Sequence, residues 1–397
     1  MPRVLLVLLV LALTGCAGEP QSWAALKKQL SGMESEQRDA AVEKFIAARG
    51  GTPIVENQTR LVFFARDVNG KTPRVVGDFN AWALRPSPGQ AAQPVYDAAI
   101  GKMTRIDGTT WSYLEGTAYT NARAEYVLFF DADAAADPMN PRKVQAYAGP
   151  RSEVRMPFWV ANPEVDDETP VPAGELLTET VVSRALLGPR RIWIYLPPGY
   201  AAATDSLYPV MYVLDGANNV EKMDVPRVLD RLIARKAIPP VIAVFSEPGD
   251  RQEEYTRNPR WRTFITSELV PQIDKRFRTF PAPDHRIILG SSLAAYGAVD
   301  LAVEFPSVFG LCAAIAPPDQ TASVIANQPR AKSAAVSIRF FVLGGVYDAM
   351  IDGARRLRTT LDGVNAPVTY WEAPEGHNTN TFRNHLDDAV KALLTPP

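Results

Sequence analysis

The sequence predicts an α/β fold in the C-terminal half, a mostly parallel sheet with helices on both faces, preceded by a small all-β immunoglobulin-like sandwich. After residue 175, short apolar runs alternate with helical stretches, which is typical of strand–helix units. Between residues 55 and 160, short runs rich in Val, Phe and Tyr alternate with turn residues. A length of 397 residues is too great for one core, so two domains are expected.

Composition excludes several classes of function. Hydrophobic residues make up 46% and charged residues 22% of the chain, which are globular values. A net charge of -2 gives no electrostatic attraction for nucleic acid. The sequence has two cysteines and three histidines, and none of them has the spacing of a zinc site. We therefore expect no metal, no organic cofactor and no nucleic-acid partner.

The N-terminus reads as an export signal over residues 1–15. Arg3 gives a short positive region, and the apolar run Val4–Leu13 is too short to span a bilayer. The run ends in Leu13-Thr-Gly-Cys16, which resembles a bacterial lipobox, so we expect Cys16 to be lipidated and to anchor the protein to a membrane. Ala17, and not Asp, follows the cysteine, which favours the outer membrane over retention in the inner membrane, so the expected location is the periplasm or outer membrane. The alternative is an ordinary signal peptide with an accidental cysteine.

Three segments are expected before the C-terminal domain. Residues 16–54 form a helical lead-in, because apolar residues recur at helical spacing between Gln21 and Arg49. Residues 55–160 form the sandwich, and the proline-rich residues 161–174 form a linker. The expected strands of the sandwich are Thr59–Ala65, Arg74–Gly77, Thr110–Leu114 and Ala124–Phe130.

Residues 175–397 form the predicted α/β domain. Its first two strands suit an antiparallel edge, and the later ones are continuous apolar runs that suit a sheet covered on both faces. Helices are expected over Arg257–Phe277 and Ser292–Phe305. The expected strands are Leu177–Ser183, Arg191–Leu196, Val210–Leu214, Val241–Phe245, Arg286–Leu289, Leu311–Ile315, Arg339–Leu343 and Val368–Glu372.

The segment Ile288-Leu-Gly-Ser-Ser-Leu-Ala-Ala-Tyr296 carries the strongest chemical signal. A buried strand, a sharp turn and a helix follow one another, which is the nucleophile elbow of serine hydrolases. Ser292 is the expected nucleophile, because Gly290 supplies the small residue two positions earlier. Ala294 stands where the usual pattern has glycine. Ser291 is the alternative nucleophile, one residue early.

A serine hydroxyl needs a base, and in this type of hydrolase the chain order is serine, acid, histidine. His377 follows the final strand and is preceded by a glycine, so we expect it to be the base rather than His385, which lies in a helical stretch. His285 precedes the nucleophile and suits a turn. Asp348, after the strand Arg339–Leu343, is the expected acid. Alternatively it only caps a helix, and Asp352 or Glu372 is the acid.

An oxyanion hole needs two backbone donors. One is expected to be Leu293, directly after the nucleophile. The other is assigned to Gly216 and Ala217, at the end of the strand Val210–Leu214, where glycine permits a tight turn. Arg251 and Glu254, together with Arg257, are candidate contacts for an anionic substrate, and the alternative is that they form a solvated helix start.

Several further motifs resemble the esterase family of enterochelin, feruloyl and acetyl-xylan esterases and S-formylglutathione hydrolase. The carrying segments are Gly188–Tyr200, Leu214-Asp-Gly216, Phe264–Pro271 and Phe305–Phe309. Val76-Gly-Asp-Phe-Asn-Ala-Trp82 and Asp137-Pro-Met-Asn-Pro141 resemble early-set β-sandwiches of glycogen-binding modules and of enterochelin esterases. The resemblance implies an α/β-hydrolase with a sandwich in front, and the pairing is most similar to enterochelin esterases.

We therefore expect a serine carboxyl-ester hydrolase that acts outside the cytoplasm through an acyl-enzyme. Its substrate is a small-molecule ester such as a siderophore, or alternatively a feruloyl or acetyl ester on a polysaccharide. Trp82 and Trp111 either stack on sugar rings or fill the sandwich core. An alternative from another class is a non-catalytic surface protein that binds a glycan or siderophore, with Ala294 as its only hint.

Overall fold

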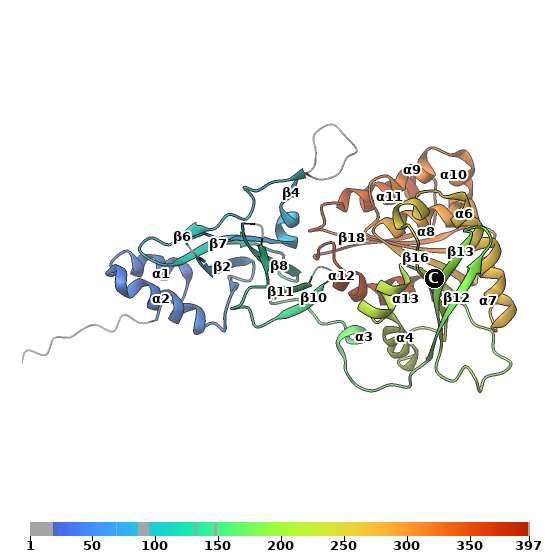
Figure 1. The fold of residues 1–397 in the computed structure, drawn as a ribbon, viewed down its shortest axis with the longest axis horizontal. Helices are drawn as coiled ribbons and strands as arrows, with labels where there is room; N and C mark the ends of the chain where they lie inside the picture. Colours follow the sequence, from blue (N-terminus) through green and yellow to red (C-terminus); the bar gives the residue numbers. More distant parts are fainter. Residues whose placement is uncertain (1–18, 69, 86–94, 132, 147–148, 396–397) are drawn as a thin grey trace, which may run out of the picture.

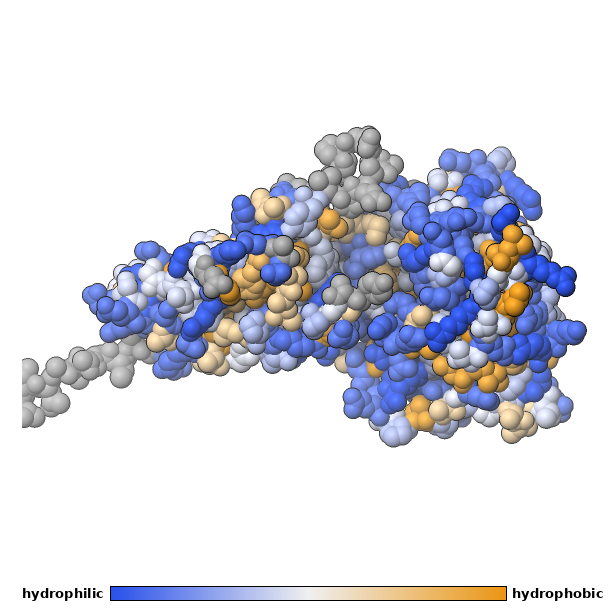
Figure 2. Space-filling view, viewed as in Figure 1, coloured by the Kyte–Doolittle hydropathy of each residue, from blue (hydrophilic) through white to orange (hydrophobic). Residues whose placement is uncertain are grey.

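The computed structural model describes residues 19–68, 70–85, 95–131, 133–146 and 149–395. These residues form an elongated molecule with two small helices at one end, a β-sandwich in the middle and an α/β domain at the other end (Figure 1). The predicted lipidation site Cys16 lies outside the described residues. Among the described residues, no helix is long and apolar enough to cross a membrane. In the view of Figure 2 the α/β domain presents a largely hydrophilic surface.

The helical lead-in consists of α1 (Trp23–Leu30) and α2 (Ser35–Ala47). Ser22 caps α1 by accepting the backbone N–H of Ala25. The apolar residues of both helices pack on one sheet of the sandwich, around Trp23, Phe64 and Trp111. Trp111 is only 1% exposed, so the possibility that it stacks on a sugar ring is wrong and it belongs to the core.

The sandwich has two main antiparallel sheets around a core that includes Phe63, Tyr126 and Leu128. One sheet has the order β1 (Ile54–Glu56), β2 (Arg60–Arg66), β7 (Trp111–Thr117), β6 (Thr104–Arg105). The other has the order β10 (Lys143–Ala146), β11 (Gly149–Arg155), β8 (Arg123–Phe130), β3 (Arg74–Gly77), with β9 (Asp133–Ala135) also on β8. Two short strands, β4 (Leu84–Arg85) and β5 (Val95–Tyr96), pair with each other in a separate antiparallel sheet. All four strands expected here are present.

The α/β domain is built on an eight-stranded sheet in which the first two strands, β12 and β13, are antiparallel and the others parallel. This confirms the predicted fold class and all eight expected strands. The spatial order is β12 (Glu175–Ser183), β13 (Gly188–Leu196), β15 (Ile242–Ser246), β14 (Val210–Leu214), β16 (Arg286–Ser291), β17 (Leu311–Ile315), β18 (Arg339–Gly345), β19 (Val368–Ala373).

Helices cover both faces of this sheet. One face packs on α5 (Arg251–Tyr255), α6 (Pro259–Thr263), α7 (Val270–Arg276), α8 (Leu293–Glu304), α9 (Thr321–Ala326), α10 (Pro329–Ala335) and α11 (Ile351–Gly363). The other packs on α3 (Pro163–Asp166), α4 (Val225–Ala234), α12 (Thr379–Asn384) and α13 (Leu386–Leu394). Two apolar layers result, as the continuous apolar strands require. The short α3 lies within the segment expected to be a linker.

Candidate active site

The nucleophile elbow forms where β16 ends and α8 begins. Ser292 stands between them with φ 57° and ψ -129°, a strained conformation for a residue with a side chain. Its backbone N–H donates to the carbonyl of Ile315 at 2.8 Å, so the neighbouring strand β17 holds the turn in place. A β-carbon on Gly290 would lie 2.2 Å from the carbonyl oxygen of Ala294, which shows why that position must be glycine. The methyl group of Ala294 itself is fully buried and fits.

The structure brings the three predicted catalytic side chains into one chain of hydrogen bonds. His377 Nε2 lies 3.0 Å from Ser292 Oγ, and its Nδ1 lies 2.7 Å from Asp348 Oδ2. Asp348 is 4% exposed, and its other oxygen accepts the backbone N–H of Met350 at 2.8 Å. The carboxylate is therefore oriented by the start of the next helix as well as by the imidazole. This is the arrangement in which a histidine removes a serine proton while a buried carboxylate holds its tautomer.

The alternative residues lie elsewhere. His385 contacts Asp388 and Glu375, and these carboxylates raise its pKa to about 9 against the opposing effect of burial. It is a charged structural histidine rather than a base. His285 is paired with its neighbour Asp284 in a turn. Glu372 and Asp352 both pair with Arg355, on the outside of the domain.

The predicted oxyanion donors differ in whether their backbone N–H already has an acceptor. Leu293 is the first residue of α8, so its backbone N–H has no acceptor within the helix and is free for a developing oxyanion. The N–H of Ala217 instead donates to the carboxylate of Glu247 at 2.6 Å. This leaves Gly216, which follows Asp215 in a left-handed conformation, as the remaining candidate for the second donor.

Arg251 and Glu254 both pair with neighbouring residues, and of the two only Arg251 also lines the cleft at Ser292. Arg251 makes two hydrogen bonds to Asp215, at 2.8 and 2.7 Å, and a longer one of 3.3 Å to the carbonyl of Ser291. Arg251 therefore links Asp215, which directly follows β14, to the elbow at Ser291. Glu254 is 4% exposed, pairs with Arg190 and accepts the backbone N–H of Gly249, so the expectation that it contacts substrate is wrong.

A cleft of about 730 Å³ opens at Ser292 and His377. Its walls carry three carboxylates and two cationic side chains, and the pKa of Glu247 is raised by burial. The cleft wall therefore carries charged groups of both signs. The charged and polar lining residues are Asp215, Asn218, Glu221, Lys222, Glu247, Arg251 and Thr379.

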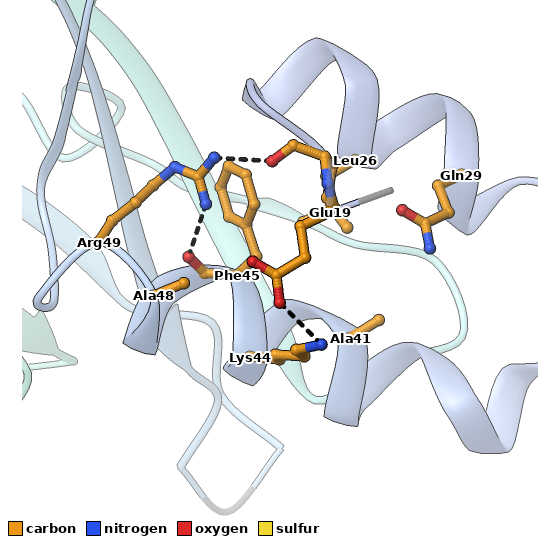
Figure 3. Close-up of a pocket in the computed structure, with 9 residues that line it drawn as sticks. Glu19, Leu26, Gln29, Ala41, Lys44, Phe45, Ala48 and Arg49 are labelled. Carbon is orange, nitrogen blue, oxygen red and sulfur yellow. Dashed lines mark hydrogen bonds and ion pairs between the residues drawn. The ribbon is translucent and has the colours of Figure 1, made fainter. Parts of the chain in front are cut away.

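A second, smaller cavity of about 90 Å³ lies at the opposite end of the molecule, between α1 and α2 (Figure 3). Glu19 pairs with Lys44 across it at 2.9 Å, and Arg49 donates to the carbonyl of Pro20 at 2.7 Å. This ion pair is exposed, and the cavity is remote from the serine. We assign it no part in the chemistry.

Residues 183–390, just over half of the chain, match the family model Esterase, described as Putative esterase. The chain belongs to this esterase family. The match covers nearly the whole α/β domain, from β12 to α13. The matched range includes Ser292, Asp348 and His377. This esterase membership supports the predicted enzyme class, a carboxylic ester hydrolase.

The chain is also similar in sequence to two curated relatives and in fold to a solved structure. It is 25% identical to the iron(III) enterobactin esterase of Escherichia coli over 281 residues, 66% of this chain and 68% of that one. It is 27% identical to YbbA of Bacillus subtilis over 139 residues, 31% of this chain and 54% of YbbA. The chain thus spans about half to two thirds of these relatives. The ferric enterobactin esterase of Salmonella typhimurium has the same fold, with a TM-score of 0.69 at 19% identity over 88% of this chain and 98% of that one.

Sequence reasoning missed one part of the site. The loop that bears His377 contacts the β-sandwich through Asp78, Glu125 and Arg123. Asp78 lies in the segment Val76–Trp82, which the sequence identifies only as a motif of the sandwich fold. Asp78 is the one ionisable residue of this motif, and that was the signal available in the sequence.

Proposed function

We propose that this chain hydrolyses carboxylic esters through an acyl-enzyme on Ser292. His377 Nε2 takes the proton of Ser292 Oγ while Oγ attacks the ester carbonyl carbon. The tetrahedral oxyanion is stabilised by the N–H of Leu293 and a second donor at Gly216. As the intermediate collapses, the alcohol leaves with the proton from His377, and Ser292 remains acylated. Asp348 stabilises the imidazolium in both steps.

Water completes the cycle. It enters the open cleft, loses a proton to His377 and attacks the acyl carbon, so that the carboxylic acid leaves and Ser292 Oγ recovers its proton. The observation that carries this mechanism is the pair of hydrogen bonds that joins Ser292, His377 and Asp348.

The test is labelling with a fluorophosphonate probe, together with hydrolysis of short p-nitrophenyl esters. We expect wild-type protein to be labelled on one serine and to turn over the ester. Ser292→Ala should lose labelling and about 10³-fold or more of kcat. Ser291→Ala is the matched control, because no hydrogen bond among the described residues joins its hydroxyl to the triad, and it should retain both. Intact protein that fails to label would favour the non-catalytic alternative.

For the substrate we propose a siderophore-type ester, a small molecule with several carboxyl-ester bonds. The E. coli relative is an iron(III) enterobactin esterase, and the match to it extends beyond the α/β domain. The polysaccharide alternative is less well supported, because Trp111 is buried and Trp82 is covered by Arg151 at 4.1 Å from its ring centre. A panel of a catecholate trilactone, feruloylated sugars and acetylated xylan separates the two. A higher kcat/KM on the sugar esters would overturn this proposal.

We further propose that the protein is an exported lipoprotein, anchored at Cys16 on the periplasmic or outer-membrane side. Support comes from the apolar run Val4–Leu13 and the lipobox-like Leu13–Cys16. The wild-type protein should sediment with membranes, and Cys16→Ala should move to the soluble fraction. Unchanged fractionation of Cys16→Ala would contradict the lipid anchor.

A further inference from the structure

The loop that carries the base lies against the β-sandwich on both sides of His377. Before the histidine, the carbonyl of Pro374 accepts the backbone N–H of Arg123 at 3.2 Å. After it, Asn378 Nδ2 donates to Asp78 Oδ2 at 3.0 Å, and Asn380 donates to Glu125 at 2.6 Å. Pro374–Asn380 will be called the base loop. In Figure 1, α12, whose first residues belong to this loop, lies on the side of the α/β domain that faces the sandwich.

Asp78 is the centre of this contact. It is fully buried, and its oxygens also accept the backbone N–H of Glu125 at 2.7 Å and the indole N–H of Trp82 at 2.8 Å. The carboxylate is therefore held rigidly by its own domain before it meets the base loop. A buried carboxylate requires such donors, since desolvation without hydrogen bonds is costly.

Two residues of the base loop, Gly376 and Asn378, lie directly against Asp78. A β-carbon on Gly376 would lie 2.0 Å from Asp78 Oδ1, so the residue before the catalytic histidine must be glycine for the two domains to meet. Asn378 has two tasks. Its Oδ1 caps α12 by accepting the backbone N–H of Thr381 at 2.8 Å, while its Nδ2 faces Asp78. One asparagine thus joins the helix start, the sandwich and the base loop.

We propose that Asp78 is a positioning residue for the catalytic base: by fixing Asn378 and abutting Gly376, it sets the place of the His377 imidazole relative to Ser292. The proposal rests on the function above, in which His377 is the base. It makes the β-sandwich part of the catalytic machinery, although Asp78 touches neither the substrate nor the reacting atoms.

Asp78 and Asn378 are 300 residues apart, and the imidazole belongs to the residue directly before Asn378. A displacement of the imidazole by about 1 Å is enough to cost on the order of 100-fold in rate, because proton transfer needs a short and aligned contact. A purely structural contact would instead change stability and leave the folded enzyme's kcat unchanged.

A charge swap tests this. Asp78→Asn should lower kcat about 10- to 100-fold with KM changed by less than about threefold. Asn378→Asp should lower it at least as much, since it places two carboxylates together. The double variant Asp78→Asn/Asn378→Asp restores a donor–acceptor pair in reverse, because the amide introduced in the sandwich can donate to the carboxylate introduced in the base loop. It should recover kcat to within about tenfold of wild type.

The matched control is Asp137→Asn. Asp137 is also a buried carboxylate of the sandwich, 1% exposed and bonded to Tyr126 at 2.8 Å, but no hydrogen bond or ion pair of the described residues joins it to the base loop. Its variant should lose stability and keep kcat. Asn378→Ser is the milder second variant, since serine still caps α12 but cannot reach Asp78 as a donor. It should also lower kcat, and it covers the case in which Asp78→Asn does not fold.

Active sites are counted by fluorophosphonate labelling, and kcat is expressed per labelled site. The positioning role is overturned if Asp78→Asn and Asn378→Ser keep wild-type kcat, if Asp137→Asn loses as much as Asp78→Asn, or if the swap is no better than its single variants. A wild-type protein without labelling and without ester turnover refutes the proposed function itself. An active wild type with a fully active Asp78→Asn refutes the positioning role alone.

Discussion

The proposed nucleophile and the proposed base of this site are held by different parts of the molecule. Ser292 stands between β16 and α8, and every contact that shapes its turn lies within the α/β domain. His377 stands on a loop whose neighbours on both sides bond to the sandwich. The elbow is a local motif with a local cause. The base loop depends on contacts with the sandwich, which is hundreds of residues away in sequence. Substitutions at the elbow and in the base loop should therefore have different effects on activity and stability.

The largest effect is expected at the elbow. In Gly290→Ala the new β-carbon would lie 2.2 Å from a backbone oxygen of α8, which cannot move without distorting the helix. We expect loss of about 10³-fold or more in kcat and a lower melting temperature. Gly363→Ala, where a β-carbon meets nothing within 4 Å, is the control. Near-normal turnover by Gly290→Ala would mean that the turn is not as tight as the structure shows.

Gly376→Ala is the corresponding change in the base loop. Its β-carbon would meet the Asp78 carboxylate rather than the backbone of a helix, so we expect a smaller loss of about 10- to 100-fold in kcat with little change in KM. Steady-state kinetics and thermal melting should show activity falling more than stability. Gly116→Ala in β7 has open space and should behave as wild type. A drop in melting temperature as large as that of Gly290→Ala would remove the distinction between the two regions.

The pH dependence of stability should also separate them. Burial, and then the neighbouring Glu125, raise the pKa of Asp78 to about 7. Since its folded pKa exceeds its unfolded value, the stability that this group contributes is fully present below the unfolded pKa and is lost as pH rises through about 7. Asp78→Asn lacks this ionisation. Its melting temperature should fall less between pH 5 and pH 8 than that of wild type, by several degrees at about 2–4 °C per kcal/mol.

The raised pKa of His385 also makes stability fall as pH rises from the unfolded pKa of this group to about 9. This loss is the same in wild type and in Asp78→Asn, so it cancels when the two are compared. If the melting temperatures of wild type and Asp78→Asn change with pH in the same way between pH 5 and pH 8, Asp78 does not titrate in that range.

The smallest effect is expected at the acid loop. The hydroxyl of Tyr347, next to Asp348, accepts the backbone N–H of Tyr119 in the sandwich at 2.8 Å. Tyr347→Phe removes this one bond and keeps the ring contact, so we expect about 1 kcal/mol of stability and less than about threefold in kcat. Tyr370→Phe, on an exposed strand, is the control. A loss equal to that of Gly376→Ala would show that the acid, too, is positioned by the sandwich.

The difference between the regions also explains what could be predicted from the sequence. Ser292, Asp348 and His377 follow strand ends in chain order, and parallel strands bring their C-terminal ends to one edge, so the local pattern was sufficient to predict that these three side chains meet. The strands of the sheet were predictable for the same reason, since continuous apolar runs between turns leave few alternatives.

The remaining features depend on tertiary contacts. The N–H of Ala217 donates to Glu247, which directly follows β15, and Glu254 is held by Arg190 of β13. Trp111 is covered by α1 and α2, which no pattern within its own strand indicates. Asp78 and Asn378 each lie in a recognisable motif, but nothing in either motif says that they meet.

Hydrogen exchange in the full-length protein measures the difference between the two regions most directly. In Asp78→Ala, peptides that cover residues 374–385 should exchange faster than in wild type, while those that cover 286–300 should keep their protection, because local opening follows the contacts that are lost. Asp137→Ala should leave residues 374–385 unchanged. Unaltered exchange of the base loop in Asp78→Ala, or an equal increase at the elbow, would contradict the conclusion that the sandwich holds the catalytic base.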